Sequence, residues 1–124
     1  LGRLCAYAAK KALEGKTITI VNSEKAIITG SKQDILKRYK QKATRGGPYH
    51  GPYFAKIPHR MVKRSIRGMI PYRIKKGLDA FKRIKCYKGN LSNLPAQKIA
   101  STQLKTLKIP RYMTIGDICK AIKK

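Results

Sequence analysis

Apolar residues at the start of the chain predict one helix followed by two short strands. Residues 3–13 are rich in Ala and Leu, and a glycine follows where a helix is expected to stop. The apolar positions at helical spacing are Leu4, Ala8 and Ala12. Residues 17–21 have the sequence TITIV, a β-branched run with the length of a buried strand, and residues 26–29 form a second candidate strand after a turn. A helix followed by an apolar strand favours an α/β fold.

A second helix is predicted to begin after residue 31 and to end near residue 42. Ser31 and Asp34 have the spacing of a capping box, in which two side chains satisfy backbone donors of the first turn. The apolar residues on one side of this helix are Ile35, Leu36 and Tyr39, and lysines and an arginine lie elsewhere on it. The helix is therefore predicted to be amphipathic.

Two prolines frame a predicted third helix. Pro58 can open the helix at its first position, where the missing N–H has no partner to lose, and Pro71 disfavours helical geometry at the residue before it. A fourth helix is predicted over residues 73–83, with Gly77 as a weak point, and residues 84–87 are predicted to return to the sheet. The apolar positions at i, i+4 and i+7 of the fourth helix are Ile74, Leu78 and Phe81.

The apolar period is lost after residue 89. Residues 90–112 mix polar, basic and isolated apolar positions, so we expect an extension that wraps over a partner surface. Thr114 and Asp117 have the spacing of a second capping box at the start of a final short helix. The isoleucines that share a face of that helix are Ile115, Ile118 and Ile122. The predicted organisation is an α/β domain over residues 1–89 and a basic C-terminal extension over residues 90–124.

The charge of the chain indicates a binding protein rather than a generic α/β domain. The 124 residues, enough for one core, include 30 Lys plus Arg against 5 Asp plus Glu, a formal net charge of +25. Internal ion pairs cannot balance this excess, so the partner must be nucleic acid, an anionic membrane surface or an acidic protein. The longest apolar runs are only a few residues, which argues against a membrane partner.

The residues that usually carry catalysis or bind metals are sparse. The three cysteines, Cys5, Cys86 and Cys119, are far apart, odd in number and without CxxC spacing, which argues against a disulfide framework or a zinc knuckle and favours a reducing compartment. His50 and His59 are the candidate ligands or catalysts, but a metal site needs three or four convergent donors and the five acids are scattered. We expect no enzyme activity, no metal or other cofactor and no small-molecule substrate.

The basic residues concentrate in an acid-free block over residues 37–76. Its thirteen Lys or Arg are at positions 37, 38, 40, 42, 45, 56, 60, 63, 64, 67, 73, 75 and 76. Such a block repels itself unless an anion lies against it.

The helix that begins at Pro58 carries a cationic stripe within this block. Its members at i, i+3, i+4 and i+7 are Arg60, Lys63, Arg64 and Arg67, and the predicted core side consists of Val62, Ile66, Met69 and Ile70. One side can pack on a core while the other contacts phosphates. The alternative is a solvated surface helix, but such helices normally mix both signs of charge.

The loop TRGGPYHGPYF, residues 44–54, interleaves glycines with aromatic residues. Its backbone can approach phosphates closely while Tyr49, Tyr53 or Phe54 stacks on exposed bases. The alternative is an ordered loop whose aromatic side chains fill the core. We leave both open, with Phe54 favouring the core and Tyr49 favouring RNA, and expect His50 to have a structural or RNA-contacting role.

Two long motifs resemble a known family. LGRLCAYAAKKALEGKTITIVNSEKAIITGS, residues 1–31, is similar to the LGRLAS helix and VVNAEKAVISG pattern of the universal ribosomal large-subunit protein thirteen family. RSIRGMIPYRIKKGLDAFKRIKCYKG, residues 64–89, resembles its second hallmark, centred on RGMLP and ending in a KVYxG strand. GGPYHGPYFAKIPHR and LKTLKIPRYMTIGDI resemble the loop and the basic extension of its archaeal and eukaryotic members.

The resemblance implies a three-layer α/β/α domain with a small, mostly parallel sheet, a basic C-terminal extension and a short final helix. It also implies a structural constituent of the large ribosomal subunit that stabilises folded large-subunit ribosomal RNA, touches neighbouring ribosomal proteins, and supports assembly and translation in the cytosol, with transit through the nucleolus in a eukaryote. By motif position it adds Arg3, Arg45, Gly68 and the pair Lys75 and Lys76 to the stripe.

The complete set of candidate RNA-binding residues combines the block, the loop and these motif positions. It consists of Arg3, Lys37, Arg38, Lys42, Arg45, Tyr49, His50, Lys56, Arg60, Lys63, Arg64, Arg67, Gly68, Arg73, Lys75 and Lys76. Two competing functions are weighed against this one: an RNA chaperone or regulatory binder acting off the ribosome, which is the runner-up, and an enzyme on a nucleotide or RNA, which rests only on the α/β layout and has little other support.

The sequence departs from the family pattern in two places. Members usually carry a strand with an acidic residue just before LGRL, whereas this sequence begins at Leu1, so we expect either a sheet without that edge strand or an incomplete sequence. The loop also carries a doubled Gly-Pro-Tyr, at residues 47–49 and 51–53, which leaves the register across the loop open.

Overall fold

The computed structural model describes residues 1–90, 93, 95, 97–99 and 110–123. The elements in chain order are α1 (Gly2–Leu13), β1 (Ile18–Ile20), the 3-10 helix η1 (Ser23–Lys25), β2 (Ile27–Thr29), α2 (Lys32–Thr44), α3 (Pro58–Arg67), α4 (Lys75–Lys82), β3 (Ile84–Cys86), β4 (Tyr112–Thr114) and α6 (Ile115–Lys123). The predicted α/β class is confirmed, and each predicted helix has a counterpart within a few residues of its expected bounds.

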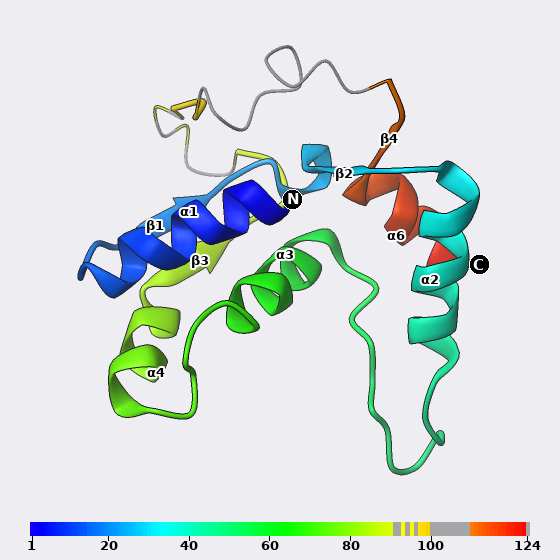
Figure 1. The fold of residues 1–124 in the computed structure, drawn as a ribbon, viewed down its shortest axis with the longest axis horizontal. Coiled ribbons are helices and arrows are strands. Elements are labelled where there is room, and N and C mark those ends of the chain that lie inside the picture. The colour runs from blue at the N-terminus through cyan, green and yellow to red at the C-terminus, as the bar shows by residue number, and fades with distance from the viewer. Residues whose placement is uncertain (91–92, 94, 96, 100–109, 124) are drawn as a thin grey trace.

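The strands of the described residues form two separate pairs (Figure 1). β1 pairs with β3 in parallel, with Ile18 opposite Ile84, so residues 84–87 do return to a sheet as predicted. β2 pairs with β4 in antiparallel orientation, with Ile27 opposite Thr114. The small sheet implied by the resemblance is therefore divided into a parallel and an antiparallel pair. The sequence did not predict β4, because its three residues carry no extended β pattern.

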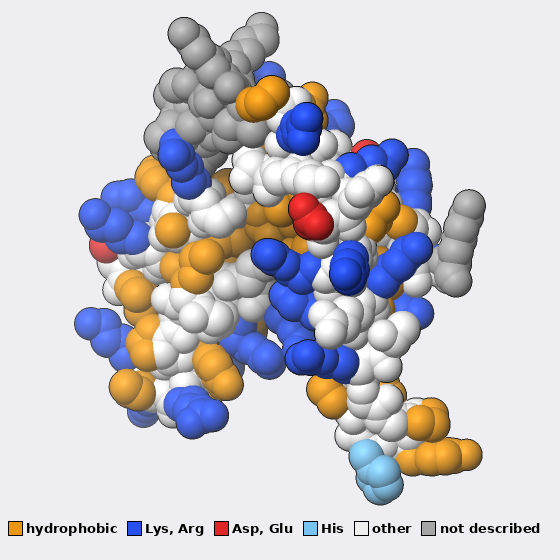
Figure 2. Space-filling view, turned by 45° about the vertical axis from the view of Figure 1, so that its right-hand side comes forward, with side chains coloured by type: hydrophobic (Ala, Val, Ile, Leu, Met, Phe, Trp, Pro, Cys, Tyr) orange, Lys and Arg blue, Asp and Glu red, His pale blue; other side chains and the backbone are white. Residues whose placement is uncertain are grey.

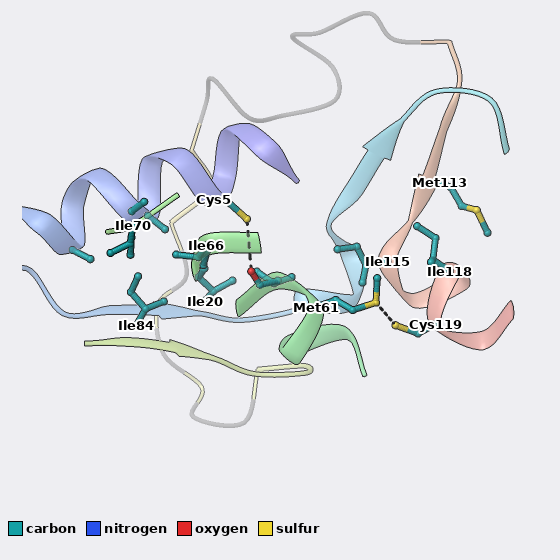
Figure 3. Packing of buried hydrophobic residues seen from close by; sticks show 14 of the residues in the cluster. Cys5, Ile20, Met61, Ile66, Ile70, Ile84, Met113, Ile115, Ile118 and Cys119 are labelled. Carbon is teal, nitrogen blue, oxygen red and sulfur yellow. Dashed lines mark hydrogen bonds between the residues drawn. The ribbon is translucent and has the colours of Figure 1, made fainter. Parts of the chain in front are cut away.

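Helices α1 and α3 pack on each other above the parallel pair (Figure 3). The buried side of α1 consists of small residues, Cys5, Ala8, Ala9 and Ala12. Small side chains allow close approach, and the Cys5 thiol lies 3.9 Å from the carbonyl oxygen of Val62, to which it donates. Ile66 on α3 and Ile84 on β3 are fully buried in this part of the core. Each such side chain contributes about 1.5–3 kcal/mol through burial.

The C-terminal helix completes the same core at the N-terminal end of α3. Ile115, Ile118 and Cys119 of α6 are buried, and the Cys119 thiol donates to the sulfur of Met61 on α3 over 3.2 Å (Figure 3). Thr114 caps α6, because its hydroxyl accepts the N–H of Asp117 at 3.2 Å and donates to that residue's carboxylate at 2.6 Å. The predicted N-terminal cap of α6 and its buried isoleucine face are confirmed.

The expected extension over residues 90–112 falls largely outside the described residues. The division at residue 89 stays a prediction. Residues 112–123, which follow this segment, join the core through β4 and α6.

Helix α2 shows one confirmed and one wrong prediction. Ile35 is buried, and Leu36 and Tyr39 pack against the core, as the pattern predicted. Ser31 occupies the N-cap position with extended backbone, but its side chain makes no capping hydrogen bond. The capping box with Asp34 is therefore wrong, although the spacing is the same as at Thr114.

The apolar side predicted for the fourth helix is wrong for two of its three residues. Ile74 is 63% exposed and Leu78 is 43% exposed, while Gly77 and Ala80 of α4 are buried instead. The cause is the reversal of the chain after α3. Helix α3 ends at Arg67, four residues before Pro71, and the reversal brings the Pro71 carbonyl against Gly77. Only a residue without a side chain fits that close approach, so the smallest side of α4 faces inward.

Candidate nucleic-acid interface

Helix α3 separates the core from the cationic stripe. Pro58 occupies the first turn, and Val62 and Ile66 are fully buried. The stripe residues Arg60, Arg64 and Arg67 are exposed and Lys63 is half-buried, as the helical period requires. The predicted two-sided character of this helix is confirmed.

The prediction that Met69 lies on the core side of this helix is wrong. Met69 lies in the turn beyond the end of α3 and is 45% exposed, because the helical period no longer applies there. Met61, for which the sequence pattern predicted no core position, is 3% exposed, belongs to the core cluster and contacts Cys119 of α6. The inward side therefore keeps Val62, Ile66 and Ile70, gains Met61 and loses Met69.

Aromatic rings, not carboxylates, hold the stripe cations in place. The Lys63 ammonium lies 5.1 Å from the centroid of the Phe81 ring. The Arg67 guanidinium lies 5.2 Å from the Tyr72 ring. Contacts of this kind are attractive but leave the positive charge in place. In the part of the chain that the structure describes, the one ion pair joins Lys11 to Glu14, outside the block of residues 37–76.

Helix α2 adds cations on its exposed side. Lys37, Arg38 and Lys42 are all exposed. The Lys42 ammonium lies 5.3 Å from the ring centroid of Tyr39, a half-buried residue that packs against the core. Burial also raises the pKa of the Tyr39 hydroxyl, so it stays a neutral donor at physiological pH.

The loop between α2 and α3 is a tight hairpin that projects from the body of the molecule (Figure 2). The backbones of Gly47 and Gly51 exchange hydrogen bonds of 3.3 and 3.0 Å. Gly46 has φ +101°, and a Cβ there would lie 2.5 Å from the Gly51 backbone, so the hairpin requires glycine at that position. The Tyr53 hydroxyl donates to the Pro48 carbonyl at 2.8 Å and closes the loop.

The hairpin answers the question that the sequence left open for its aromatic residues. Tyr49 is 88% exposed, and His50 is exposed beside it. Phe54 instead packs against the core and meets the Tyr39 ring edge-on, with centroids 6.0 Å apart. Phe54 thus has the core role favoured for it, while Tyr49 is free to contact a partner. The remaining basic residues of the loop, Arg45 and Lys56, are exposed.

The other predicted residues lie apart from the stripe or beyond its end. Arg3 lies in the first turn of α1 and lines a cavity of about 620 Å³ together with β1 and β2. Gly68 is the C-cap of α3 and is exposed. The cations that follow the turn, Arg73, Lys75 and Lys76, are also exposed. The structure therefore brings together α2, the hairpin and α3, whereas Arg3 does not line the cleft between them and lies at a cavity that Tyr39 of α2 also lines.

A small cleft lies between α2 and α3, and the sequence pattern did not indicate it. It has a volume of about 230 Å³, and its lining residues are Tyr39, Lys42, Phe54, Met61, Arg64, Ser65 and Gly68. Arg64 lies 5.1 Å from the Phe54 ring centroid and donates to the Tyr53 carbonyl at 3.2 Å. No local pattern could have indicated this cleft, because the loop places residues from 39 to 68 side by side.

Residues 1–93 match the family model described as Ribosomal protein L13. The chain belongs to the ribosomal protein L13 family. It is 40% identical over 124 residues to the large ribosomal subunit protein uL13 of Archaeoglobus fulgidus, an alignment that covers 97% of this chain and 80% of the relative. It is 42% identical over 122 residues to uL13 of Methanosarcina barkeri, with 95% and 87% covered. For uL13 of Methanocaldococcus jannaschii the identity is 41% over 124 residues, with 97% and 88% covered.

These three relatives in the L13 family are archaeal, which agrees with the predicted archaeal or eukaryotic branch. Across the described residues, no helix has the length and apolar character needed to span a bilayer. Within the same residues, no three or more His, Cys, Asp or Glu side chains group as metal ligands would.

The cysteines of this L13 family member are suited to packing rather than reactivity. Burial raises the pKa of the Cys5 thiol to about 11, and burial raises the pKa of the Cys86 thiol to about 11 as well. The reactive form of cysteine is the thiolate, which is scarce at neutral pH when the pKa is this high. Cys5, Cys86 and Cys119 are free thiols.

Proposed function

We propose that this protein is a structural constituent of the large ribosomal subunit, which binds and stabilises folded ribosomal RNA through α3 and the preceding hairpin. The L13 family, a family of ribosomal proteins and not of enzymes, supports this function. The observation that carries it is the exposed side of α3, where Arg60, Arg64 and Arg67 face solvent while the opposite side is locked in the core.

Such a helix suits phosphate binding for two reasons. Its buried side fixes the direction of the stripe, so cations are ordered before RNA arrives and less entropy is lost on binding. The neighbouring hairpin and α2 extend the same charge, and Figure 2 shows Lys and Arg side chains spread over this face with only isolated acidic ones. Phosphate contacts of this kind position a protein on folded RNA without reading its sequence.

The central experiment compares charge reversal on α3 with matched reversal elsewhere. Arg60→Glu with Arg67→Glu removes two exposed stripe cations, and Lys16→Glu with Lys85→Glu makes the same change in net charge at exposed sites outside the block. Binding to a large-subunit RNA fragment is measured as a function of salt. The α3 variant is expected to weaken binding much more than the control and to lower the salt slope by roughly 0.7–0.9 per lost phosphate contact.

The wild-type slope tests the electrostatic basis of the proposal. If about six to ten phosphates are neutralised, log affinity falls with log salt at a slope between roughly −4 and −9. A slope near zero, or equal losses in both double variants, would contradict the assignment of RNA binding to α3. The protein is also expected to sediment with salt-washed large subunits.

The runner-up, an RNA chaperone acting off the ribosome, would use the same surfaces. Chemical footprinting separates the two. Protection confined to one structured region of the ribosomal RNA favours the ribosomal role, whereas scattered protection favours the chaperone. The ribosomal role further implies location on cytosolic ribosomes, with nucleolar transit in a eukaryote, which fluorescence imaging of the tagged chain would test.

Neighbouring large-subunit proteins are proposed as further partners, and the exposed side of α4 supports this. Ile74 is the N-cap of α4 and Leu78 lies four residues later, with its N–H donating to the Ile74 carbonyl at 2.9 Å, so the two exposed apolar residues are one helical turn apart. Large exposed apolar residues that lie together commonly mark a contact site. A photo-crosslinking residue at position 74 is expected to label a ribosomal protein in isolated subunits, and labelling of RNA alone would contradict this.

A further inference from the structure

The cleft between α2 and α3 has the size of a site for one planar ring. Its volume of about 230 Å³ lies below the roughly 300–1,000 Å³ of sites that enclose whole drug-sized ligands. The buried side chain of Met61 lies at the cleft, and Gly68 contributes no side chain to it. The cleft therefore suits insertion of a single flat group rather than a folded ligand.

Two cation–aromatic pairs form the walls of this cleft. Tyr39 and Phe54 meet edge-on at 6.0 Å, Lys42 lies 5.3 Å from the first ring, and Arg64 lies 5.1 Å from the second. The guanidinium of Arg64 is also tethered, because its Nη1 donates to the Tyr53 carbonyl at 3.2 Å. Phe54 thus supports the Arg64 guanidinium, and Arg64 as a residue is exposed to solvent.

The charge of the cleft selects the kind of partner. Among the described residues that line it, Lys42 and Arg64 are the charged ones, and no carboxylate accompanies them. A flat aromatic group that brings its own negative charge satisfies both the shape and the charge, and a nucleotide unit of RNA has this composition. Bases stack on guanidinium planes as well as on aromatic rings, and proteins engage them where they are unpaired.

We propose that this cleft is a nucleobase site, in which one unpaired base of the RNA stacks on the Arg64 guanidinium while Lys42 holds an adjacent phosphate. The inference rests on the proposed RNA-binding function and adds to it. The stripe contacts phosphates of any folded RNA, whereas the cleft requires a base that has left its helix.

Two RNA duplexes whose numbers of phosphates differ by one test this. One carries a single bulged 2-aminopurine, a fluorescent base analogue, and the other is fully paired with 2-aminopurine at an internal position. Binding of the whole chain is measured at one fixed salt concentration. The bulged duplex is expected to bind roughly fivefold to a hundredfold more tightly, the range for stacking of one base, and its fluorescence is expected to change on binding.

The decisive variant is Arg64→Lys, which keeps the charge and removes the plane. It is expected to abolish the preference for the bulged duplex, so that the variant binds the two duplexes with equal affinity. The matched control is Arg111→Lys, the same exchange at an exposed arginine that does not line the cleft, and it is expected to retain the preference.

Each remaining outcome decides a different question. Equal wild-type affinity for both duplexes overturns the nucleobase site and leaves the proposed function standing, whereas failure to bind either duplex overturns the proposed function. A preference that persists in Arg64→Lys overturns the assignment to this cleft. If thermal unfolding shows that Arg64→Lys is unfolded, the wild-type fluorescence decides instead, because an inserted base changes its emission and a solvent-exposed bulge does not.

Discussion

Replacing Gly77 by alanine is expected to destabilise the protein, although alanine is the better helix former. Gly77 is buried in α4, at the place where the chain returns after α3. A Cβ built there would lie 2.1 Å from the Pro71 carbonyl oxygen and 2.5 Å from its carbonyl carbon. Both are backbone atoms, so no side-chain rotation can relieve the overlap, and α4 must move away from the preceding turn.

The expected magnitude follows from two opposing terms. Alanine in place of glycine stabilises a helical backbone by about 1 kcal/mol. Overpacking in a closed site costs typically about 1–3 kcal/mol, and the rigid backbone contact places this variant at the upper end. The net loss is therefore about 2 kcal/mol, which for a domain of this size lowers the melting temperature by about 6–10 °C.

Gly68→Ala is the matched control. Gly68 is the C-cap of α3 with φ −67°, and a Cβ there would meet the Ser65 carbonyl oxygen at 3.6 Å, an ordinary contact. The free energy of unfolding of this variant should match the wild type or exceed it by up to about 1 kcal/mol. Circular dichroism at 222 nm follows both variants through heating and through urea. A Gly77→Ala protein as stable as Gly68→Ala would refute the close approach of α4 to residue 71.

Four further substitutions and one reagent test other parts of the structure. Met61→Ala should lower the free energy of unfolding by about 2–5 kcal/mol, whereas Met69→Ala should change it by less than about 1 kcal/mol, because only Met61 is buried. Thr114→Ala removes a formed cap and should cost about 1 kcal/mol, whereas Ser31→Ala should be nearly neutral. Iodoacetamide at pH 8.5 should modify Cys5 slowly in the native protein and quickly in urea, because burial raises the pKa of that thiol to about 11.

The measurements for these predictions are urea unfolding for the substitutions and mass spectrometry for the alkylation. Equal losses of unfolding free energy at positions 61 and 69, or at 114 and 31, would contradict the faces and caps described above.

The Cys5 thiol also determines the direction in which the free energy of unfolding changes with pH. The pKa of Cys5 is near 9 in the unfolded chain and about 11 in the folded protein. Its contribution to the free energy of unfolding is therefore complete below pH 9 and is lost as pH rises toward 11.

The spacing of residues predicted local structure well and local contacts less well. Pro58 opens α3 as expected, and the period of that helix separated Val62 and Ile66 from the exposed arginines. The same capping spacing occurs at Ser31 and at Thr114, yet only Thr114 forms the bonds. A cap depends on side-chain orientation as well as on sequence spacing, and orientation is set by the surrounding fold.

The period failed where tertiary contacts outweighed it. Ile74 and Leu78 have the apolar spacing of a buried helix side, but the return of the chain at residue 71 requires glycine inward and turns these two residues to solvent. The core position of Met61 was missed for a related reason, since its partner Cys119 on α6 is distant in sequence.

The sequence by itself determined the charge of this protein, the acid-free block of residues 37–76, the two-sided α3 and the motifs of the L13 family, because these depend on residue type and on short spacings. Only the tertiary structure decided which apolar residues are buried, where α6 docks, and that Lys42 of α2 and Arg64 of α3 line one cleft. Burial and cleft formation arise from contacts between segments far apart in the chain, and local periodicity carries no information about which segments will meet.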